Sequence, residues 1–308
     1  MKNHRILKLY DKLLNNEEIN LDRIAQEENI SKRTIERDIA DIKNHLVLQG
    51  EGKEFFFDKK IKKYTLTNNN NDKFTKSEAL AISKILLHSR AFLKNEMYIL
   101  VDKLLKQCTL KEDYKELEAM IKNEKFLYME LTNKRSFIAD LYTYGKAIQN
   151  KNKMKIRYIK TNKELVERII QPVGLMFSEF YFYLLGHIEN IDKKEHFENK
   201  DDIFPTIYRV DRILKFEVLK EKFTNIYYNN RFQEGKFRKQ IHLMTGGKLR
   251  KVEFFYKGTS IEAVLDKIPT AKIMKKSEQG YWIAAEVFGN GFDRWLKILG
   301  DEVEITKS

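Results

Sequence analysis

The sequence predicts a multidomain α+β protein. At 308 residues, the chain is longer than one hydrophobic core usually supports. Apolar residues recur at helical spacing through residues 5–46 and 75–148, whereas the alternation typical of strands begins at Met154. An asparagine-rich run at 68–72 has the composition of a linker. The parts expected are residues 1–66, 75–148, 149–222 and 240–308.

The composition argues against membrane-spanning, secreted, disulfide-bonded and metal-binding classes of protein. No window approaches the roughly 18 uninterrupted apolar residues of a membrane span, and the N-terminus lacks the apolar core of a signal peptide. A cytoplasmic location without a membrane partner is therefore expected. The single cysteine, Cys108, excludes an internal disulfide and any multi-cysteine metal site. No pair of histidines has metal-binding helical spacing, so neither a metal nor another cofactor is expected.

The formal net charge of +13 favours a polyanionic partner, because clustered Lys and Arg release counterions when they bind nucleic acid. An AT-rich coding sequence would also enrich lysine, so the placement of the charge is more informative than its total. Residues 1–66 contain 14 basic and 12 acidic residues, whereas residues 215–251 contain ten basic and three acidic residues. The basic excess therefore lies mainly outside the N-terminal part.

Residues 1–66 have the pattern of three helices followed by two short strands. Apolar residues in 5–14 and 21–27 lie at helical spacing, and Ser31 is the expected N-cap of a third helix that ends near Leu46. The apolar stripe of this third helix would pack on the first two helices, and basic residues in its first turns would point away from them. A helix that reads DNA presents basic residues in this way. A solvated face on a plain helical bundle is the alternative. The residues expected to contact DNA are Ser31, Lys32, Arg33, Thr34 and Arg37 in the helix, and Lys60 and Lys62 between the strands.

This N-terminal part resembles the winged helix-turn-helix of DeoR-type regulators. The resemblance rests on Ile24-Ala25, on residues 30–35 (Ile-Ser-Lys-Arg-Thr-Ile) and on residues 37–39 (Arg-Asp-Ile). It implies that residues 1–66 bind operator DNA.

Residues 75–148 are expected to be mostly helical, starting with a capping box in which Thr75 is the N-cap and Glu78 the third helical residue. Their apolar content suits either a linker that relates the DNA-binding part to the central part, or a dimer interface. The sequence leaves both uses open.

From Met154 onward, strand patterns at 154–159, 165–170, 180–187 and 203–213 predict a small antiparallel barrel. In the third strand, Tyr183 lies on one face and Phe182 on the other. Arg209 and Arg212 lie on opposite faces of a regular strand. Both reach one site only if a bulge or a strand end intervenes.

Three segments of this region look like the motif series of the WYL-domain family: residues 172–175 (Pro-Val-Gly-Leu), 182–186 (Phe-Tyr-Leu-Leu-Gly) and 208–213 (Tyr-Arg-Val-Asp-Arg-Ile). Phe182 stands where the name-giving Trp would be, which keeps an aromatic plane but loses the indole donor. The resemblance implies an Sm-like barrel that senses an effector. Family members are associated with DNA-damage responses and phage defence, and some respond to single-stranded DNA.

Aromatic rings beside guanidinium groups suit a phosphate-bearing ligand or stacked bases. With the family resemblance, the expected effector-binding residues are Tyr183, Phe182, Arg209 and Arg212. The alternative is that Tyr183 is a core tyrosine and that the two arginines pair with Asp211 or Glu217.

Residues 252–305 read strand, helix, strand, strand, helix, strand, which is the order of a ferredoxin-like domain. Residues 292–300 also resemble the C-terminal extension that accompanies WYL domains. With this part included, the resemblance to WYL-domain transcriptional regulators covers nearly the whole chain.

No phosphate-binding glycine loop, nucleophile elbow or zinc-protease motif is present in the sequence, so no catalytic residues and no enzymatic activity are expected. We expect a homodimeric regulator that binds double-stranded operator DNA, with a single-stranded nucleic acid, a nucleotide or another anion as its effector. The alternative is an RNA- or single-stranded-DNA-binding module without operator-specific regulation. An enzyme with a nucleotide pocket has the least support.

Overall fold

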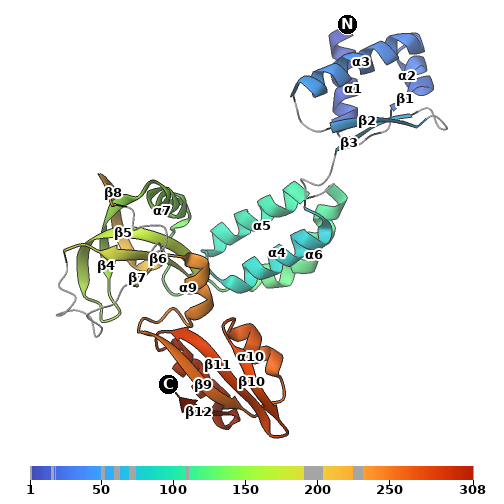
Figure 1. Ribbon diagram of the computed structural model, residues 1–308. Helices are drawn as coiled ribbons and strands as arrows, with labels where there is room; N and C mark the ends of the chain where they lie inside the picture. Colours follow the sequence, from blue (N-terminus) through green and yellow to red (C-terminus); the bar gives the residue numbers. More distant parts are fainter. Residues whose placement is uncertain are drawn as a thin grey trace. The chain divides into compact units, whose positions relative to one another are not determined.

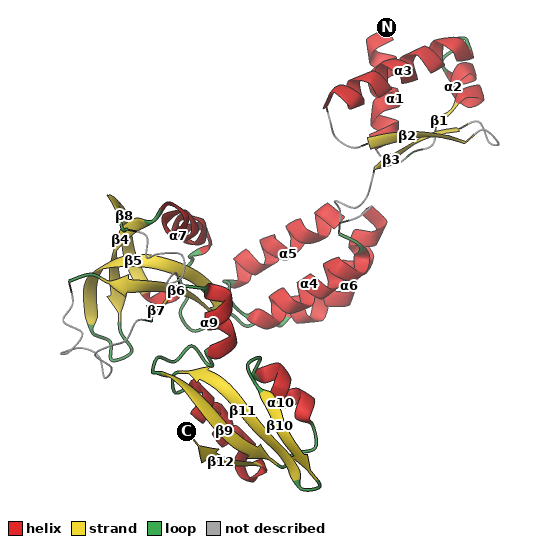
Figure 2. Cartoon of the chain, in the orientation of Figure 1, coloured by secondary structure: helices red, strands yellow, loops and turns green. Residues whose placement is uncertain are grey.

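The computed structural model describes residues 2–14, 17, 19–49, 53–58, 63–68, 74–108, 111–190, 204–224 and 232–307 (Figure 1). The chain divides into two compact units. The first comprises Met1–Ile82 and Asp102–Ile121, and the second comprises Ser83–Val101 and Lys122–Ser308. Within the described ranges, every helix is too short or too polar to span a lipid bilayer. Figure 2 distinguishes the helices from the antiparallel strands, and the α+β class is as predicted.

The first unit begins with the three predicted helices and the predicted pair of strands. These are α1 (Lys2–Leu14), α2 (Leu21–Glu27), α3 (Lys32–Gln49), β2 (Lys53–Asp58) and β3 (Lys63–Asn68). An additional strand, β1 (Ile19–Asn20), pairs with β3 and completes a sheet of order β1-β3-β2. Two residues are too few to show alternation, so the sequence could not indicate β1.

The apolar faces of α1, α2 and α3 meet in one core. Its buried side chains are Leu9, Leu13, Ile19, Leu21, Ile24, Ile35, Ile39, Ile42 and Leu46. Asn20 caps α2, because its side-chain oxygen accepts hydrogen bonds from two backbone N–H groups. Arg5 of α1 lies 2.6 Å from the buried carboxylate of Asp38 in α3. These contacts hold α3 by its inner face.

Three further helices follow: α4 (Lys76–Ser89), α5 (Lys94–Cys108) and α6 (Lys111–Phe126). The predicted capping box is present at the start of α4. The backbone N–H of Thr75 donates to the Glu78 carboxylate at 2.7 Å, and the N–H of Glu78 donates to the Thr75 hydroxyl at 3.3 Å.

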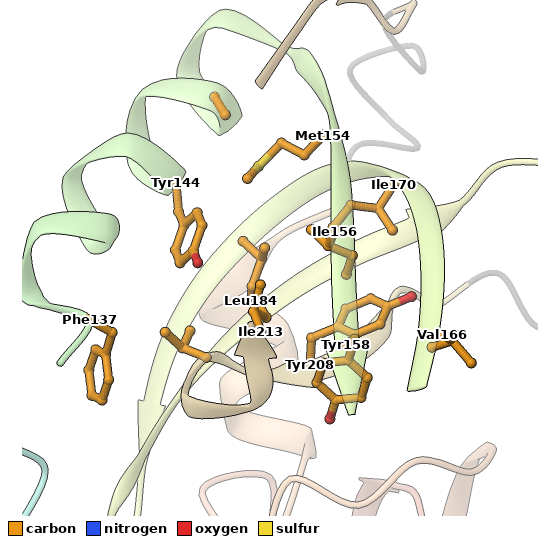
Figure 3. Close-up of a cluster of buried hydrophobic side chains, with 12 residues drawn as sticks. Phe137, Tyr144, Met154, Ile156, Tyr158, Val166, Ile170, Leu184, Tyr208 and Ile213 are labelled. Carbon is orange, nitrogen blue, oxygen red and sulfur yellow. The ribbon is translucent and has the colours of Figure 1, made fainter. Parts of the chain in front are cut away.

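The second unit contains a five-stranded antiparallel sheet of order β7-β6-β5-β4-β8. Its strands are β4 (Asn152–Ile159), β5 (Leu165–Ser178), β6 (Tyr181–Ile188), β7 (Thr206–Arg209) and β8 (Ile213–Lys222). The helix α7 (Ile138–Asn150) packs against β4 and β5. Figure 3 shows Tyr144 of α7 in the same cluster as Leu184 and Ile213 of the sheet.

This sheet differs from the prediction in three ways. The closed Sm-like barrel is not confirmed, because no pairing between described residues joins the edge strands β7 and β8. Strand β5 continues past Pro172, where only a strand to residue 170 was predicted. Pairing of β5 with β4 ends at Ile170, so Pro172 needs no N–H there, and a register shift follows before Gly174. The strand predicted at 203–213 is interrupted by a 3₁₀ turn, η2 (Val210–Arg212).

The C-terminal part has the predicted order of elements. These are β9 (Leu249–Tyr256), α10 (Ile261–Lys267), β10 (Lys272–Ser277), β11 (Gly280–Phe288), α11 (Gly291–Leu299) and β12 (Val303–Lys307). Their sheet is antiparallel, with the order β10-β11-β9-β12. The helix α9 (Glu234–Gln240) was not predicted, because it is short and lies in the basic stretch 215–251. Phe237 of α9 packs on Phe288 of β11, with ring centroids 5.0 Å apart.

Candidate functional site

The main candidate site is a cavity of about 710 Å³ between the five-stranded sheet and the C-terminal part of the second unit. This volume is within the range of small-molecule sites, roughly 300–1,000 Å³. Its cations are Arg209 and Arg212 from the sheet side, and Lys248 and Arg294 from the C-terminal side. The described lining residues include no carboxylate. The cavity is therefore suited to an anion.

The turn η2 brings the two sheet-side arginines to the same cavity. Strand β7 ends at Arg209, and the helical turn that follows returns Arg212 to the same side. The end of strand β7 is therefore the interruption that the sequence required if Arg209 and Arg212 were to reach one site. Arg212 donates from Nη1 to the hydroxyl of Thr161, at 3.0 Å, in the turn between β4 and β5.

Arg209 is held firmly by its neighbours. Its Nε and Nη2 donate to the two carboxylate oxygens of Asp211, at 3.1 and 2.6 Å, and its guanidinium lies 3.5 Å from the ring centroid of Tyr181. Burial is the largest single effect on the pKa of Arg209 and acts to lower it, but the hydrogen bonding to Asp211 and the negative charge of that carboxylate together leave this pKa raised. Nη1 makes no hydrogen bond to a described residue. Arg209 is thus a fixed cation with one donor group left for the cavity.

The other three cations have no acidic partner among the described residues. Arg212 bonds only the Thr161 hydroxyl, and the side chains of Lys248 and Arg294 make no ion pair with any described carboxylate. The sequence left open that both arginines pair with acidic residues. Among the described residues, Arg209 has such a partner and Arg212 does not. Cations gathered without counter-charge repel one another, so a bound anion would stabilise this arrangement.

Tyr183 both packs in the core and lines the cavity. Its side chain is buried against Met176, Leu185 and Phe237, and its backbone pairs with that of Arg209. Burial raises the pKa of Tyr183 to about 12. The phenol is therefore neutral near pH 7 and keeps an O–H donor at the cavity wall.

Phe182 lies on the opposite face of β6 from Tyr183. Its ring packs with Phe92, Phe137 and Phe177, at centroid distances of 5.8, 5.8 and 5.1 Å. Phe182 also lines a separate cavity of about 10 Å³. The structure therefore brings Tyr183, Arg209 and Arg212 together and leaves Phe182 apart, as the alternation of side chains along a strand requires.

Sequence reasoning missed the C-terminal side of the cavity. Lys248 belongs to the basic stretch 215–251, but no local pattern distinguished it, and Arg294 lies in α11. Gly247 precedes Lys248 with a φ of +150°, and a Cβ there would come within 2.7 Å of the Cα of Gly289. Only glycine permits this close approach of two loops.

The described residues among those expected to contact DNA divide into two groups. Ser31 and Thr34 form the cap of α3, with their hydroxyls 2.9 Å apart, and Lys32 forms an ion pair with Asp22 of α2. Arg33 and Arg37 are exposed one turn apart, and neither forms an ion pair with a described residue. Lys60 and Lys62 lie outside the described residues.

The described residues contain no group of three or more His, Cys, Asp or Glu side chains that could hold a metal ion.

Family models match two parts of the chain. A helix-turn-helix domain model matches residues 5–51, and a WYL domain model matches residues 141–218. The chain therefore combines a helix-turn-helix domain with a WYL domain, which matches a WYL-domain transcriptional regulator.

Solved structures give weaker similarities. The proteasome accessory factor B/C (PafBC) of Arthrobacter aurescens is 14% identical, with a TM-score of 0.33; the match covers all of this chain but only 46% of that one. A structure described as a CRISPR Cas-related protein is 13% identical, with a TM-score of 0.38, and the match covers 79% of this chain and 70% of that one. A search of curated proteins gave no match.

Proposed function

We propose that the protein is a transcriptional regulator that binds operator DNA through α3 and changes its operator affinity when an anionic effector occupies the cavity beside Tyr183. The observation that carries the proposal is the set of four cations around that cavity. Three of them lack a described carboxylate partner.

The DNA-binding step would use Arg33 and Arg37. Both side chains leave the outer face of α3, whose inner face is buried, so they can enter the major groove together. Arginine recognises guanine through two parallel hydrogen bonds. The strands β2 and β3 would form the wing that contacts phosphates.

We propose a homodimer, since helix-turn-helix proteins commonly bind paired half-sites as dimers. Exposed apolar side chains of α4 and α5 in the second unit support an association surface: Ile85 is 70% exposed and Ile99 53%. This region would serve as the helical linker and dimerisation part.

The effector would be a nucleotide or a single-stranded nucleic acid. Phosphate groups suit Arg212 and Arg294, and a base would pack against the part of the cavity wall that includes Tyr158. Because the cations come from both the sheet and the C-terminal part, a bound polyanion would link these two parts of the second unit.

The regulatory step would be thermodynamic linkage. An effector that binds one arrangement of the regulator better than another shifts the operator affinity by that difference in binding free energy. An effector that prefers the DNA-bound arrangement would recruit the protein to the operator, and one that prefers the other would release it.

The C-terminal part is proposed to be ferredoxin-like. This assignment is supported by the succession of β9, α10, β10, β11, α11 and β12, and by their antiparallel sheet.

The test starts from genome-wide mapping of bound DNA, which identifies an operator. Anisotropy titrations then measure operator and effector binding, with a 5′-phosphorylated thymidine pentanucleotide as the effector probe. Arg212→Ala should weaken probe binding at least about tenfold, which corresponds to roughly 1.4 kcal/mol for a lost charge-assisted hydrogen bond. The control is Arg157→Ala, which removes an exposed arginine of β4 that does not line the cavity. Equal probe affinity in all three proteins would refute the effector site.

A second candidate function is RNA or single-strand binding through residues 215–251. The observation that favours it is the edge strand β8, which exposes Lys215, Lys220 and Lys222. This candidate predicts that single strands bind as tightly as any mapped duplex, and that binding falls when these three lysines are replaced by Ala.

A further inference from the structure

The buried carboxylate of Asp211 lies behind the cavity and contacts residues on two sides. Only 6% of Asp211 is exposed, and both of its carboxylate oxygens accept from Arg209. On the other side, Asn133 Nδ2 donates to the carbonyl oxygen of Asp211 at 2.7 Å and to its Oδ2 at 3.2 Å. Asn133 belongs to residues 127–137, the segment that joins α6 to α7. Asp211 therefore connects a cavity cation to this segment.

Arg135, which belongs to the same segment as Asn133, is short of a hydrogen-bond partner. Arg135 Nη2 lies 3.3 Å from the Asp140 carboxylate in α7, whereas its Nη1 is buried with no hydrogen-bond acceptor among the residues that the structure describes. A buried donor without an acceptor is unfavourable. Asn133, Arg135 and Asp211 line the same cavity of about 10 Å³. Asp211, which is paired with Arg209, thus lines the same small cavity as an arginine with an unsatisfied donor.

We propose that Asp211 is a switch residue that pairs with Arg209 in the arrangement seen here and with Arg135 once an anionic ligand has taken over Arg209. A phosphate and a carboxylate compete for the same guanidinium donors. A buried carboxylate that loses its cation is strongly unfavourable, so Asp211 gains from a new partner. Arg135 supplies it, and its Nη1 then has an acceptor.

Through this exchange of partners by Asp211, ligand binding in the cavity would change the contacts of residues 127–137. Asn133 holds both the backbone and the carboxylate of Asp211, and Arg135 is anchored to α7, which packs on the sheet. Moving the carboxylate from one arginine to the other therefore changes contacts of this segment directly. Two discrete pairings of one carboxylate form the two-state element that coupling requires.

The identity of the ligand rests on the proposed function, but the exchange itself can be tested without a ligand. Arg209→Ala mimics the loss of Arg209 from Asp211. Full-length Arg209→Ala, Arg135→Gln and the double variant are compared with the unmodified protein by their Tm values. We expect Arg135→Gln to lower the Tm clearly more in the Arg209→Ala background, because Arg135 is then the cationic partner left to Asp211.

The matched control is Arg157→Gln, which should shift the Tm equally in both backgrounds. Additive Tm shifts for Arg135→Gln and Arg209→Ala would overturn the switch. If Arg209→Ala does not fold, Arg209→Gln replaces it in the same comparison.

A second measurement follows hydrogen exchange in peptides covering residues 127–137, with the 5′-phosphorylated thymidine pentanucleotide as ligand. Binding should change exchange there in the unmodified protein and leave it unchanged in Arg135→Gln. Binding without any change in the unmodified protein would also overturn the switch. If the pentanucleotide does not bind at all, the proposed nucleic-acid effector fails, and the Tm comparison still decides whether Asp211 exchanges partners.

Discussion

Replacing Arg33 and Arg37 together by Ala should nearly abolish specific duplex binding while the fold is kept. Both side chains are exposed on the outer face of α3, and neither packs in the core formed by the inner face. A bidentate arginine–guanine contact contributes about 1–3 kcal/mol of discrimination. Two such contacts amount to about 2–6 kcal/mol per half-site, which corresponds to roughly 30- to 20,000-fold in affinity for that half-site.

The assay is an anisotropy titration of a mapped operator duplex at several salt concentrations. If the two arginines contact bases, the double variant should lose its preference for the operator over a scrambled duplex. If they contact phosphates instead, binding should weaken on both duplexes and the salt dependence should fall by about one unit per contact. The matched control is Arg23→Ala, an exposed arginine of α2 that pairs with Glu27 at 2.7 Å. Unchanged operator binding by the double variant would refute α3 as the reading helix.

Three further predictions concern the second unit. Burial raises the pKa of Tyr183 to about 12. The stability that its neutral phenol contributes is therefore present below about pH 10 and is lost as the pH rises through about 12. Tyr183→Phe should make the fall of Tm between these two pH values less steep. Phe182→Ala should destabilise the protein by about 2–4 kcal/mol in urea unfolding and leave probe affinity unchanged, because its ring packs away from the cavity; a large loss of affinity with normal stability would contradict this placement. Gly247→Ala should lower both Tm and probe affinity, whereas Gly246→Ala, where an added Cβ has no atom within 4 Å, should leave the Tm unchanged.

The N-terminal part was predictable because its signals are local. The stripe of Ile35, Ile39 and Ile42 defines the buried face of α3, and the exposed positions of Arg33 and Arg37 follow from the same periodicity. Ser31 was recognisable as a cap for the same reason. The strand β1 could not be predicted, because its two residues form a strand only through pairing with β3.

The cavity was predictable on one side only. The alternation in β6 separated Tyr183 from Phe182, and the spacing of Arg209 and Arg212 showed that an interruption was needed for a shared site. The sequence could not locate that interruption, because η2 is a three-residue turn with no Gly or Pro. Lys248 and Arg294 could not be assigned either, since only the packing of the C-terminal part beside the sheet brings them to the cavity.

The central claim is that occupancy of the cavity changes operator affinity. It is tested most directly by titrating the mapped operator with the full-length protein, with and without saturating 5′-phosphorylated thymidine pentanucleotide. Coupling energies in allosteric proteins are typically about 1–3 kcal/mol, so the operator Kd should change by roughly 5- to 150-fold. An operator Kd that is the same with the pentanucleotide bound as without it would contradict the claim.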